Sequence, residues 1–549
     1  MPSPSTSAPP AGTLAIDIRQ LPWMRRLAAD YAFDFDGVAS FYPGNPMRDD
    51  RVARRHRAST APRDGARLAA AISAQQETRQ APAAAREAAR ALAEPGTLAI
   101  VTGQQAGLFG GPLYTLHKAL TAVTLARRVS AEYGVRVVPV FWIDAEDHDW
   151  DEVRGATVLD EEQRPHTVQL ADLDGAGERP IGQLVLGRQG LDAVEAVRAL
   201  LPATEFTNDL LAMLTDAYAP GTTMSAAFGR VLEHLLGGFG LVVYDASDPA
   251  TKPLAAALFE RALADPGRTS QLAAEAGAEL ERRGYHAQVN ASEHSAPLFL
   301  IDGAREAIRF HDGTAVVAGR EMPVAELVAL ARTAPERFSP NVLLRPIVQD
   351  TLFPTICYVG GPAELAYLGQ LRNVYAHFGV PMPLIAPRAS ASVVDPATLR
   401  MLGKYDVPFA GYQRQDELTL NHLLERQLPP AIDASFAEAT AAIAARMDAV
   451  TAAAASVDTT LEGAARNTLG KMQHDLQTLH GKVVHAAKKK DETLRRQFRR
   501  TQSQLFPNGH PQEREIGAVW LLNRYGPAAV DRLAERLPFD FGHHWLLTI

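Results

Sequence analysis

The chain has 549 residues, more than one hydrophobic core usually organises, so we expect two or three domains. The hydrophobic fraction of 46% indicates a globular protein, and the formal net charge of −8 argues against a general nucleic-acid binder. A single cysteine, Cys357, excludes an intrachain disulfide, and its apolar neighbours are more typical of a small buried residue than of a nucleophile.

The N-terminal stretch, residues 1–13, is uncharged and rich in proline and serine. Such a composition is typical of a disordered tail, and it lacks the basic start and apolar centre of a signal peptide. No apolar run reaches the roughly 20 residues of a membrane-spanning helix. We therefore expect a cytoplasmic protein that binds neither membrane nor nucleic acid.

The first half of the chain predicts a parallel α/β unit. Residues 64–94 are alanine-rich and helical in character, with a break at Pro82. A short apolar strand at 96–103, a helix ending at Gly134 and a second strand at 135–143 then form a βαβ unit. Such a unit implies parallel pairing and a right-handed crossover.

The middle of the chain, 155–335, is less regular and predicts further sheet plus an inserted subdomain. Residues 238–247 resemble a buried strand, and 296–313 alternate as a hairpin would. From residue 351 the pattern of residues 96–143 recurs: a strand, Gly-Gly-Pro, a helix and a second strand. This echo predicts two similar halves of one doubly wound sheet.

The C-terminal region, 396–505, carries heptad-like apolar stripes. One stripe holds Phe436, Ile443, Met447, Val450 and Ala454, and a second holds Leu469, Met472, Leu476, Leu479 and Val483, continued after a phase slip by Leu494, Phe498 and Leu505. Two long helices joined near 456–461 predict an antiparallel coiled-coil hairpin, a structure that can also dimerise. We expect 506–549 to continue as helices that pack back on the core.

The first Gly-Gly-Pro turn is a candidate anion site. Two glycines let a ligand approach the backbone closely, and a helix start attracts anions. The candidate binding residues here are Gly103, Gln104, Gln105, Gly110, Gly111, Tyr114 and Lys118. The stretch matches neither GxxxxGK[ST] nor GxGxxG, so a tight structural turn is about as well supported as an anion site.

An acidic cluster, WIDAEDHDWDEV, follows the second strand. Open α/β sheets bind ligands at such strand ends. Asp144, Asp147 and His148 could therefore bind Mg²⁺ through water, orient an amine or act as a base. A solvated acidic loop in which an aspartate caps the next helix is the alternative, slightly favoured for most of the cluster. The sequence contains no HExxH pattern, so a zinc site is not indicated.

Two arginines beside prolines could bind a carboxylate or phosphate in bidentate fashion: Arg345 before an expected strand and Arg388 after one. Replacing Arg388 with alanine should then weaken anion binding with little loss of fold. The same echo contributes Asp350, Tyr358, Gly360, Gly361 and Glu364 as candidate binding residues. Lys489 and Arg496 belong to a basic stretch on the coiled coil, where a solvated face is favoured over a phosphate-binding wall.

Five stretches together resemble the bacillithiol biosynthesis cysteine-adding enzymes, which are ligases of low-molecular-weight thiol synthesis. They are TGQQAGLFGGPLYTLHKA (102–119), PVFWIDAEDHDWDEV (139–153), RPIVQDTLFPTICYVGGPAELAYLGQL (345–371), PMPLIAPR (381–388) and LFPNGHPQER (505–514). They occur in the family's order, so the resemblance covers nearly the whole chain, although 155–335 match poorly. The set is specific, whereas one stretch alone would not be.

The resemblance implies a Rossmann-like core over 14–395 with connecting-peptide insertions, a long coiled coil and a homodimer. It implies that L-cysteine is joined through its carboxyl to the amine of glucosaminyl-malate, the last step of bacillithiol synthesis. The core is similar to that of class I amino-acid-activating enzymes, although the chain has neither HIGH nor KMSKS. Amide formation in water needs an activated carboxyl, so ATP is the expected cofactor and Mg²⁺ a further candidate.

Within this resemblance, both Gly-Gly-Pro helix starts, with Lys118, Arg345 and Arg388, would hold anionic groups in two backbone-lined pockets. Asp147 or His148 would take the amine proton. Two other functions remain open from the residues: a sugar-nucleotide glycosyltransferase, because doubly wound folds often hold such donors, and a non-enzymatic assembly protein working through its coiled coil.

Overall fold

The computed structural model describes residues 13–47, 50–290, 292, 294–311, 313–427, 429–490 and 492–549, and the side chains at 50–53, 56 and 487–490 are outside the description. The tail expected at 1–13 lies outside the described residues, except for Thr13, which begins β1 (Thr13–Asp17). The chain divides into two compact units, Met1–Val394 with His510–Ile549, and Asp395–Gly509.

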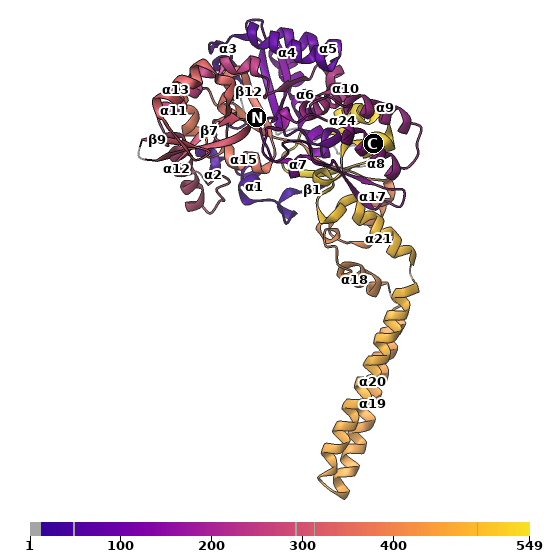
Figure 1. Ribbon diagram of the computed structural model, residues 1–549. Helices are drawn as coiled ribbons and strands as arrows, with labels where there is room; N and C mark the ends of the chain where they lie inside the picture. The colour runs from indigo at the N-terminus through magenta and orange to yellow at the C-terminus, as the bar shows by residue number, and fades with distance from the viewer. Residues whose placement is uncertain are drawn as a thin grey trace. The chain divides into compact units, whose positions relative to one another are not determined.

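The first unit, of which Figure 1 labels the strand β12, is built on a five-stranded parallel sheet. Its strand order is β13-β12-β2-β3-β6. The strands are β2 (Leu98–Gln104), β3 (Val137–Ile143), β6 (Val242–Asp245), β12 (Thr355–Gly360) and β13 (Leu384–Pro387). The chain starts in the centre, winds outward through β3 and β6, and returns to the other side of β2. This is the doubly wound Rossmann-like order, which confirms the fold class and places the switch point between β2 and β12.

Helices cover both faces of this sheet, and their ends follow local chemistry. α6 (Leu113–Tyr133) starts after Pro112 and ends at Gly134, whose φ of 61° lies in the left-handed region. The single helix expected after the second Gly-Gly-Pro turn is instead two short ones, α15 (Pro362–Leu368) and α16 (Arg372–Phe378). Arg345 was expected before a strand, but it begins α14 (Arg345–Leu352), because Pro346 suits the first turn of a helix.

The other helices of this unit support the sheet or the inserted segments. They are α1 (Arg26–Phe33), α2 (Phe35–Val38), α3 (Asp50–Thr60), α4 (Gly65–Arg79), α5 (Ala83–Ala91), α7 (Trp150–Val153), α8 (Arg188–Leu200), α9 (Thr207–Ala217), α10 (Met224–Leu236), α11 (Ala256–Ala264), α12 (Arg268–Arg282), α13 (Val324–Thr333), α22 (Gln512–Glu515), α23 (Ala518–Tyr525) and α24 (Ala528–Arg536). The break expected at Pro82 separates α4 from α5.

The middle region contains a second, antiparallel sheet with the order β10-β9-β8-β7-β11. Its strands are β7 (Ser295–Asp302), β8 (Ala304–His311), β9 (Thr314–Val317), β10 (Arg320–Pro323) and β11 (Phe338–Pro340). β7 and β8 form the hairpin that the sequence predicts, and the turn passes through Gly303 at φ 82°. A smaller hairpin joins β4 (Gly155–Leu159) to β5 (Pro165–Gln169).

The end of the chain differs from the expected run of helices. After α24 it forms β15 (His543–Leu547), which pairs with β1 on one side and with β14 (Ser390–Val393) on the other. Four of its five residues, His544, Trp545, Leu546 and Leu547, are buried, so the strand is covered on both faces. The first and last described strands, β1 and β15, thereby pair in one three-stranded sheet.

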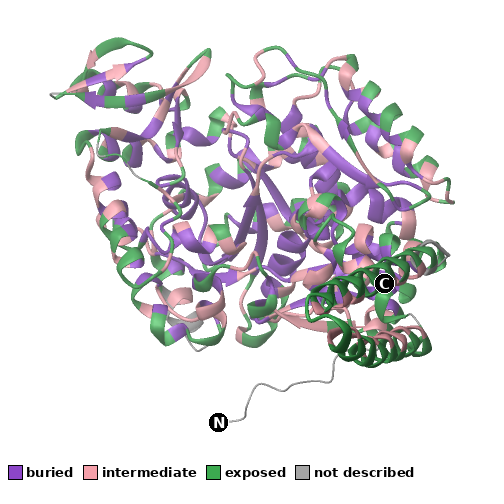
Figure 2. Cartoon of the chain, turned by 90° about the horizontal axis from the view of Figure 1, so that it is seen from below, coloured by how far each residue is buried: buried purple, intermediate pink, exposed green. Residues whose placement is uncertain are grey.

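Burial concentrates along the parallel sheet, which runs through the middle of the first unit in Figure 2. Every residue of β3 and β12 is buried, as continuous apolar runs predict for strands covered on both faces. Cys357 lies buried in β12, as expected for a small core residue. This packed sheet provides the rigid base for the polar side chains at its carboxyl edge.

The second unit is helical: α17 (Pro396–Tyr405), α18 (Leu418–Arg426), α19 (Pro430–Val457), α20 (Leu461–Lys490) and α21 (Glu492–Leu505). α19 and α20 run side by side in Figure 1, and Asp433 near the start of α19 contacts His480 near the end of α20, so they are antiparallel. The structure confirms the coiled-coil hairpin. None of the described helices is both long and apolar enough to cross a bilayer.

Candidate active site

A cavity of about 600 Å³ opens at the carboxyl ends of β2, β3 and β12. This is the edge at which open α/β sheets bind ligands, next to their switch point. The sequence-predicted residues that line it are Gly103, Gln104, Gln105, Tyr114, Lys118, Asp144, Asp147, Arg345, Tyr358, Gly361, Glu364 and Arg388. The topology therefore brings together residues from three separate stretches of the sequence.

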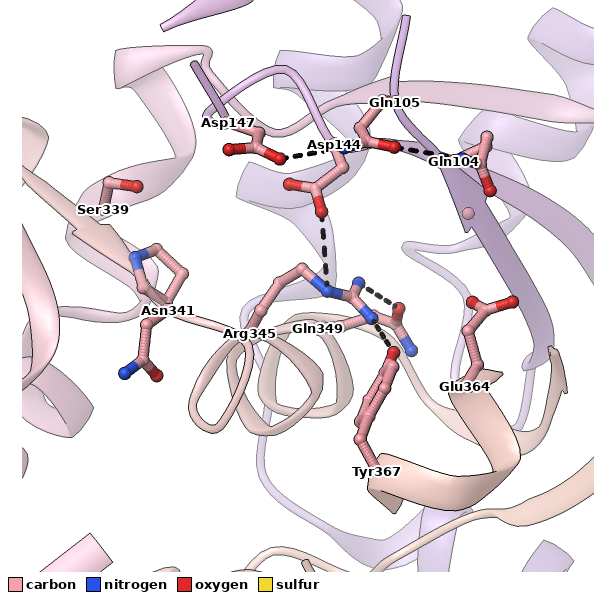
Figure 3. A network of polar contacts seen from close by, with 12 residues as sticks. Gln104, Gln105, Asp144, Asp147, Ser339, Asn341, Arg345, Gln349, Glu364 and Tyr367 are labelled. Atoms are coloured by element: carbon pink, nitrogen blue, oxygen red, sulfur yellow. Dashed lines mark hydrogen bonds and ion pairs between the residues drawn. The ribbon is translucent and has the colours of Figure 1, made fainter. Parts of the chain in front are cut away.

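The two adjacent glutamines form a directed chain of hydrogen bonds along one wall (Figure 3). Lys118 Nζ donates to Gln104 Oε1 at 3.0 Å, and Gln104 Nε2 donates to Gln105 Oε1 at 3.1 Å. Gln105 Nε2 then donates to Asp147 Oδ2 at 2.9 Å and to Glu152 Oε2 at 2.8 Å. Since lysine can only donate and ionised carboxylates only accept, both amides are held in one orientation.

Glu364 closes the helix start at the second Gly-Gly-Pro turn. It accepts from the Gly361 amide at 2.7 Å and from the Tyr358 hydroxyl at 2.6 Å, and it forms an ion pair with Lys118 at 2.5 Å. Burial alone would raise the pKa of Glu364, but Lys118 and these hydrogen bonds outweigh burial and lower it. The helix start is therefore already occupied by a carboxylate of the protein.

Asp144 and Arg345 face each other across the cavity with incomplete pairing (Figure 3). Arg345 Nε lies 3.8 Å from Asp144 Oδ2, which is too long for a hydrogen bond. The side chain of Arg345 is only 9% exposed, whereas that of Asp144 is 31% exposed. Burial raises the pKa of Asp144, and Arg345 opposes that effect. Within the described residues, this is the one ion pair that Asp144 makes.

Neutral groups hold the far side of the Arg345 guanidinium. Nη1 donates to Gln349 Oε1 at 3.3 Å, and Nη2 donates to the Tyr367 hydroxyl at 3.2 Å. Neither acceptor carries the charge that a buried guanidinium normally finds in a protein. Arg345 is therefore a desolvated cation whose most complementary partner would be an added carboxylate or phosphate.

Asp147 is more fully paired than Asp144. Besides Gln105, it accepts from the backbone amide of His148 at 2.8 Å and lies 3.5 Å from Arg305 Nη1. His148 itself does not line the cavity, and its Nδ1 lies 3.2 Å from Arg305. Asp144 is thus better placed than Asp147 or His148 to accept a proton from a ligand in the cavity.

Arg388 lines the cavity, but its guanidinium is already paired with a buried carboxylate. Its two terminal nitrogens each donate to Glu513 at 2.8 Å, and Glu513 also accepts from Ser390 Oγ and the Ala391 amide. Both side chains of the ion pair are 6% exposed. Burial would raise the pKa of Glu513, but Arg388 and His117 outweigh burial and hold it well below its usual range. This arginine is part of the fold's internal support.

The first Gly-Gly-Pro turn does not reach the cavity, which corrects the expectation of two backbone-lined pockets. Gly110 and Gly111 are buried, and the Leu113 amide at the start of α6 donates to the Ile516 carbonyl at 2.8 Å. A Cβ on Gly110 would lie 3.2 Å from the Val231 side chain. The segment before α23 occupies the space that an anion would need, so this turn is a packing turn.

Two other candidate residues of the first unit do not line the cavity. Gly360 is buried in β12 and accepts from the Arg388 amide, and Asp350 is buried on α14 behind Arg345. Arg496 is exposed on α21 in the second unit. The side chain of Lys489 lies outside the described residues.

Several lining residues escaped the sequence reasoning. They are Glu152, Gln288, Phe299, Arg305, Pro340, Asn341, Val342, Pro362, Ala363, Tyr367 and Arg514. Many come from the middle region, where β8 carries Arg305 to the cavity and stacks it on Phe299 with 3.8 Å to the ring centroid. Among them, Glu152 belongs to the acidic cluster that the sequence analysis identified, where a solvated loop was the favoured interpretation. The antiparallel sheet that brings Arg305 here is a tertiary arrangement.

The residues do not form a ready metal or triphosphate site. No group of three or more potential metal ligands is gathered among the described side chains. Asp147 and Glu152 accept hydrogen bonds from Gln105, and at the two Gly-Gly-Pro helix starts the Leu113 amide and the Gly361 amide already donate to protein oxygens. The donor set fits a carboxylate at Arg345 better than a phosphate cradle or a protein-held Mg²⁺.

Comparison with known proteins matches the chain over its whole length. The family model for the bacillithiol biosynthesis BshC N-terminal Rossmann-like domain matches residues 14–389, and that for the BshC C-terminal coiled-coil domain matches 391–549. Proteins named "Putative cysteine ligase BshC" include one from Salinibacter ruber, 36% identical over all of both chains. Those from Koribacter versatilis and Symbiobacterium thermophilum are each 34% identical, covering 95% and 98% of this chain and 97% and 98% of their own.

The order of the elements, the parallel sheet with its edge cavity and the coiled-coil hairpin agree with that match, which disfavours the glycosyltransferase and assembly-protein alternatives. The chain belongs to the bacillithiol biosynthesis BshC family.

Proposed function

We propose that this protein is a ligase that joins the carboxyl of L-cysteine to the amine of glucosaminyl-malate. The observation that supports it best is the pairing of Asp144 with Arg345 in the cavity. A proton acceptor and a desolvated guanidinium lie 3.8 Å apart, with space for a reacting group beside them. Relatives named as cysteine ligases supply the identity of the amino acid.

In this proposal Arg345 binds the carboxyl oxygens of cysteine and the negative charge that develops when the amine attacks. A guanidinium held before the substrate arrives provides such stabilisation without reorganisation. Asp144 takes the proton that the attacking nitrogen must lose, and its burial-raised pKa makes it a stronger base than an exposed aspartate. As the C–N bond forms, the C–O bond to the group that activates the carboxyl would break, so the products would be the amide, the released activating group with that oxygen, and the proton held on Asp144.

The acceptor brings further carboxylates, and Arg514 is the candidate for them. It lines the cavity, is exposed, and its guanidinium carbon lies 6.0 Å from the Tyr114 ring centroid. Unlike Arg388, it has no carboxylate partner among the described side chains. A guanidinium at the cavity mouth suits recognition of a flexible dicarboxylate.

A free carboxylate does not form an amide in water without activation, and we propose ATP as the source. ATP would supply a phosphoric anhydride of the cysteine carboxyl, with Mg²⁺ accompanying the nucleotide. Because the residues form no phosphate cradle at the Gly-Gly-Pro turns, no step of the mechanism is assigned to a nucleotide site.

The direct experiment incubates the purified protein with L-cysteine, glucosaminyl-malate and Mg-ATP under reducing conditions and detects the conjugate by mass spectrometry. We expect product with the unmodified protein and little with Asp144→Asn. Leaving out ATP should abolish product if the carboxyl is activated by the nucleotide. Absence of product with all substrates present would count against the ligase proposal.

We also propose that the coiled coil joins two copies of the chain. Val450, Met472 and Leu479 belong to the apolar stripes of α19 and α20, yet they are 51%, 43% and 51% exposed in a single chain. Burying such residues is the usual driving force for coiled-coil association. Light scattering should give twice the mass of one chain, and Leu479→Glu should reduce it.

A further inference from the structure

Asp350 lies behind Arg345 rather than in the cavity, and one side chain links the two. Gln349 Nε2 donates to Asp350 Oδ1 at 2.9 Å, while Gln349 Oε1 accepts from Arg345 Nη1. The Tyr375 hydroxyl donates to the other Asp350 oxygen at 2.5 Å. All of these side chains are buried, with Asp350 at 2% exposure.

We infer that Asp350 is a positioning residue that acts through Gln349 to hold the Arg345 guanidinium in its substrate-binding orientation.

Arg345 and Asp350 differ in the hydrogen-bonding roles that their side chains can take. An arginine has donors only, and an ionised carboxylate has acceptors only. A glutamine between them has one satisfactory orientation, with its oxygen on the arginine and its nitrogen on the carboxylate. Without the carboxylate, the amide can rotate and present its NH₂ to the guanidinium, which then loses an acceptor.

Without Gln349, the other contacts of Arg345 are too few to hold its guanidinium in one orientation. Arg345 keeps Tyr367 as its only other hydrogen-bond acceptor among the described side chains, and that bond is 3.2 Å long. Asp144 is too distant to hold the guanidinium. Loss of the Gln349 contact would therefore leave the terminal nitrogens restrained at one point, and a planar group restrained at one point can swing out of alignment.

A purely structural carboxylate at this position would be an unusual choice. Burial raises the pKa of Asp350 to about 6, so the fold holds a charge there that its surroundings disfavour. A buried group that opposes stability is commonly retained for a functional constraint. The geometry supplies that constraint, because the carboxylate determines which way Gln349 points.

A double-mutant cycle tests the inference. Asp350→Leu, which has a similar size but no acceptor, and Gln349→Met, which keeps the length of the side chain without its hydrogen bonds, should each raise the KM for L-cysteine about tenfold. The KM of the double variant should not exceed the higher of the two single-variant values, because both changes break the same chain of contacts. Tyr375→Phe is the matched control: it removes the hydrogen bond between Tyr375 and Asp350, leaves Gln349 in place and should change KM less than twofold.

KM values within twofold of the unmodified protein, or single effects that multiply in the double variant, would overturn the inference. A merely structural role would lower thermal stability without this pattern in KM. The choice of L-cysteine as the probe rests on the proposed function, so crystal structures of Gln349→Met and Asp350→Leu provide a readout that does not. We expect the Arg345 guanidinium to rotate about its Tyr367 contact in both. An unmoved guanidinium contradicts the inference, whether or not the protein joins cysteine to anything.

Discussion

The two Gly-Gly-Pro turns consist of the same three residues but differ in what surrounds them: protein packs on the first, and the second lines the cavity. At Gly110-Gly111-Pro112, the chain before α23 packs on the turn, and the helix start donates to its backbone. At Gly360-Gly361-Pro362, the second glycine and the proline line the cavity, and Glu364 from the same helix accepts from the turn. The same local sequence thus serves packing in one half of the sheet and a binding cavity in the other.

A second contrast lies between two arginines of the cavity lining. Arg388 and Glu513 satisfy each other with two short hydrogen bonds. Arg345 and Asp144 remain 3.8 Å apart. A completed buried ion pair supports the structure, whereas an incomplete pair facing a cavity retains capacity for a ligand. Each variant below changes one side of this comparison.

The largest effect should follow Arg388→Ala. Removing one member of a buried ion pair leaves Glu513 charged and unpaired, which costs about 3–5 kcal/mol. This replaces the earlier expectation of little loss of fold. Chemical denaturation measures the free energy of unfolding, and exposed Arg514→Ala is the matched control with an expected change of about 0.5 kcal/mol or less. Equal stability of the two variants would show that Arg388 is not structural.

Asp144→Asn should reduce kcat/KM by about 100-fold or more while leaving stability nearly unchanged, because it removes a proton acceptor without enlarging a cavity. Because burial raises the pKa of Asp144, activity of the unmodified protein should fall as pH drops through that raised value, where the base becomes protonated. The variant should lack this acidic limb. Asp147→Asn, whose carboxylate is already paired, should lose less activity; a larger loss there would reassign the base.

Gly110→Ala should destabilise the protein by about 1–3 kcal/mol. Its φ of 92° is strained for a residue with a side chain, and the new Cβ would press on Val231 at 3.2 Å. Thermal unfolding should detect the loss, with the remaining folded protein still active. A variant as stable as the unmodified protein would contradict the packing role of the first turn.

The smallest stability change should come from Gly361→Ala, at about 0.5 kcal/mol or less. Gly361 has an ordinary φ of −84°, and a new Cβ would meet its nearest neighbour, Glu364 Oε2, at 3.4 Å. The same thermal measurement, run beside Gly110→Ala, makes the contrast direct. Equal destabilisation of the two variants would remove the distinction between the turns.

Local chemistry allowed much of the fold to be predicted from the sequence. Continuous apolar runs predict β2 and β3, and Gly134 predicts the end of α6, because these signals depend on neighbouring residues. The turn at Gly110 could not be distinguished from that at Gly360, since the difference comes from Ile516, far along the chain. For the same reason, no local sequence pattern predicts the ion pair between Arg388 and Glu513. The position of Arg305 at the cavity is equally hidden, because this residue comes from another sheet.

The most direct test of the account is a crystal structure of the protein with bound L-cysteine. We predict that the carboxylate lies in the cavity within about 3 Å of the Arg345 guanidinium, next to Asp144. Cysteine bound elsewhere, or a carboxylate that leaves Arg345 contacting only Gln349 and Tyr367, would contradict the central claim that this incomplete ion pair is the substrate-binding point.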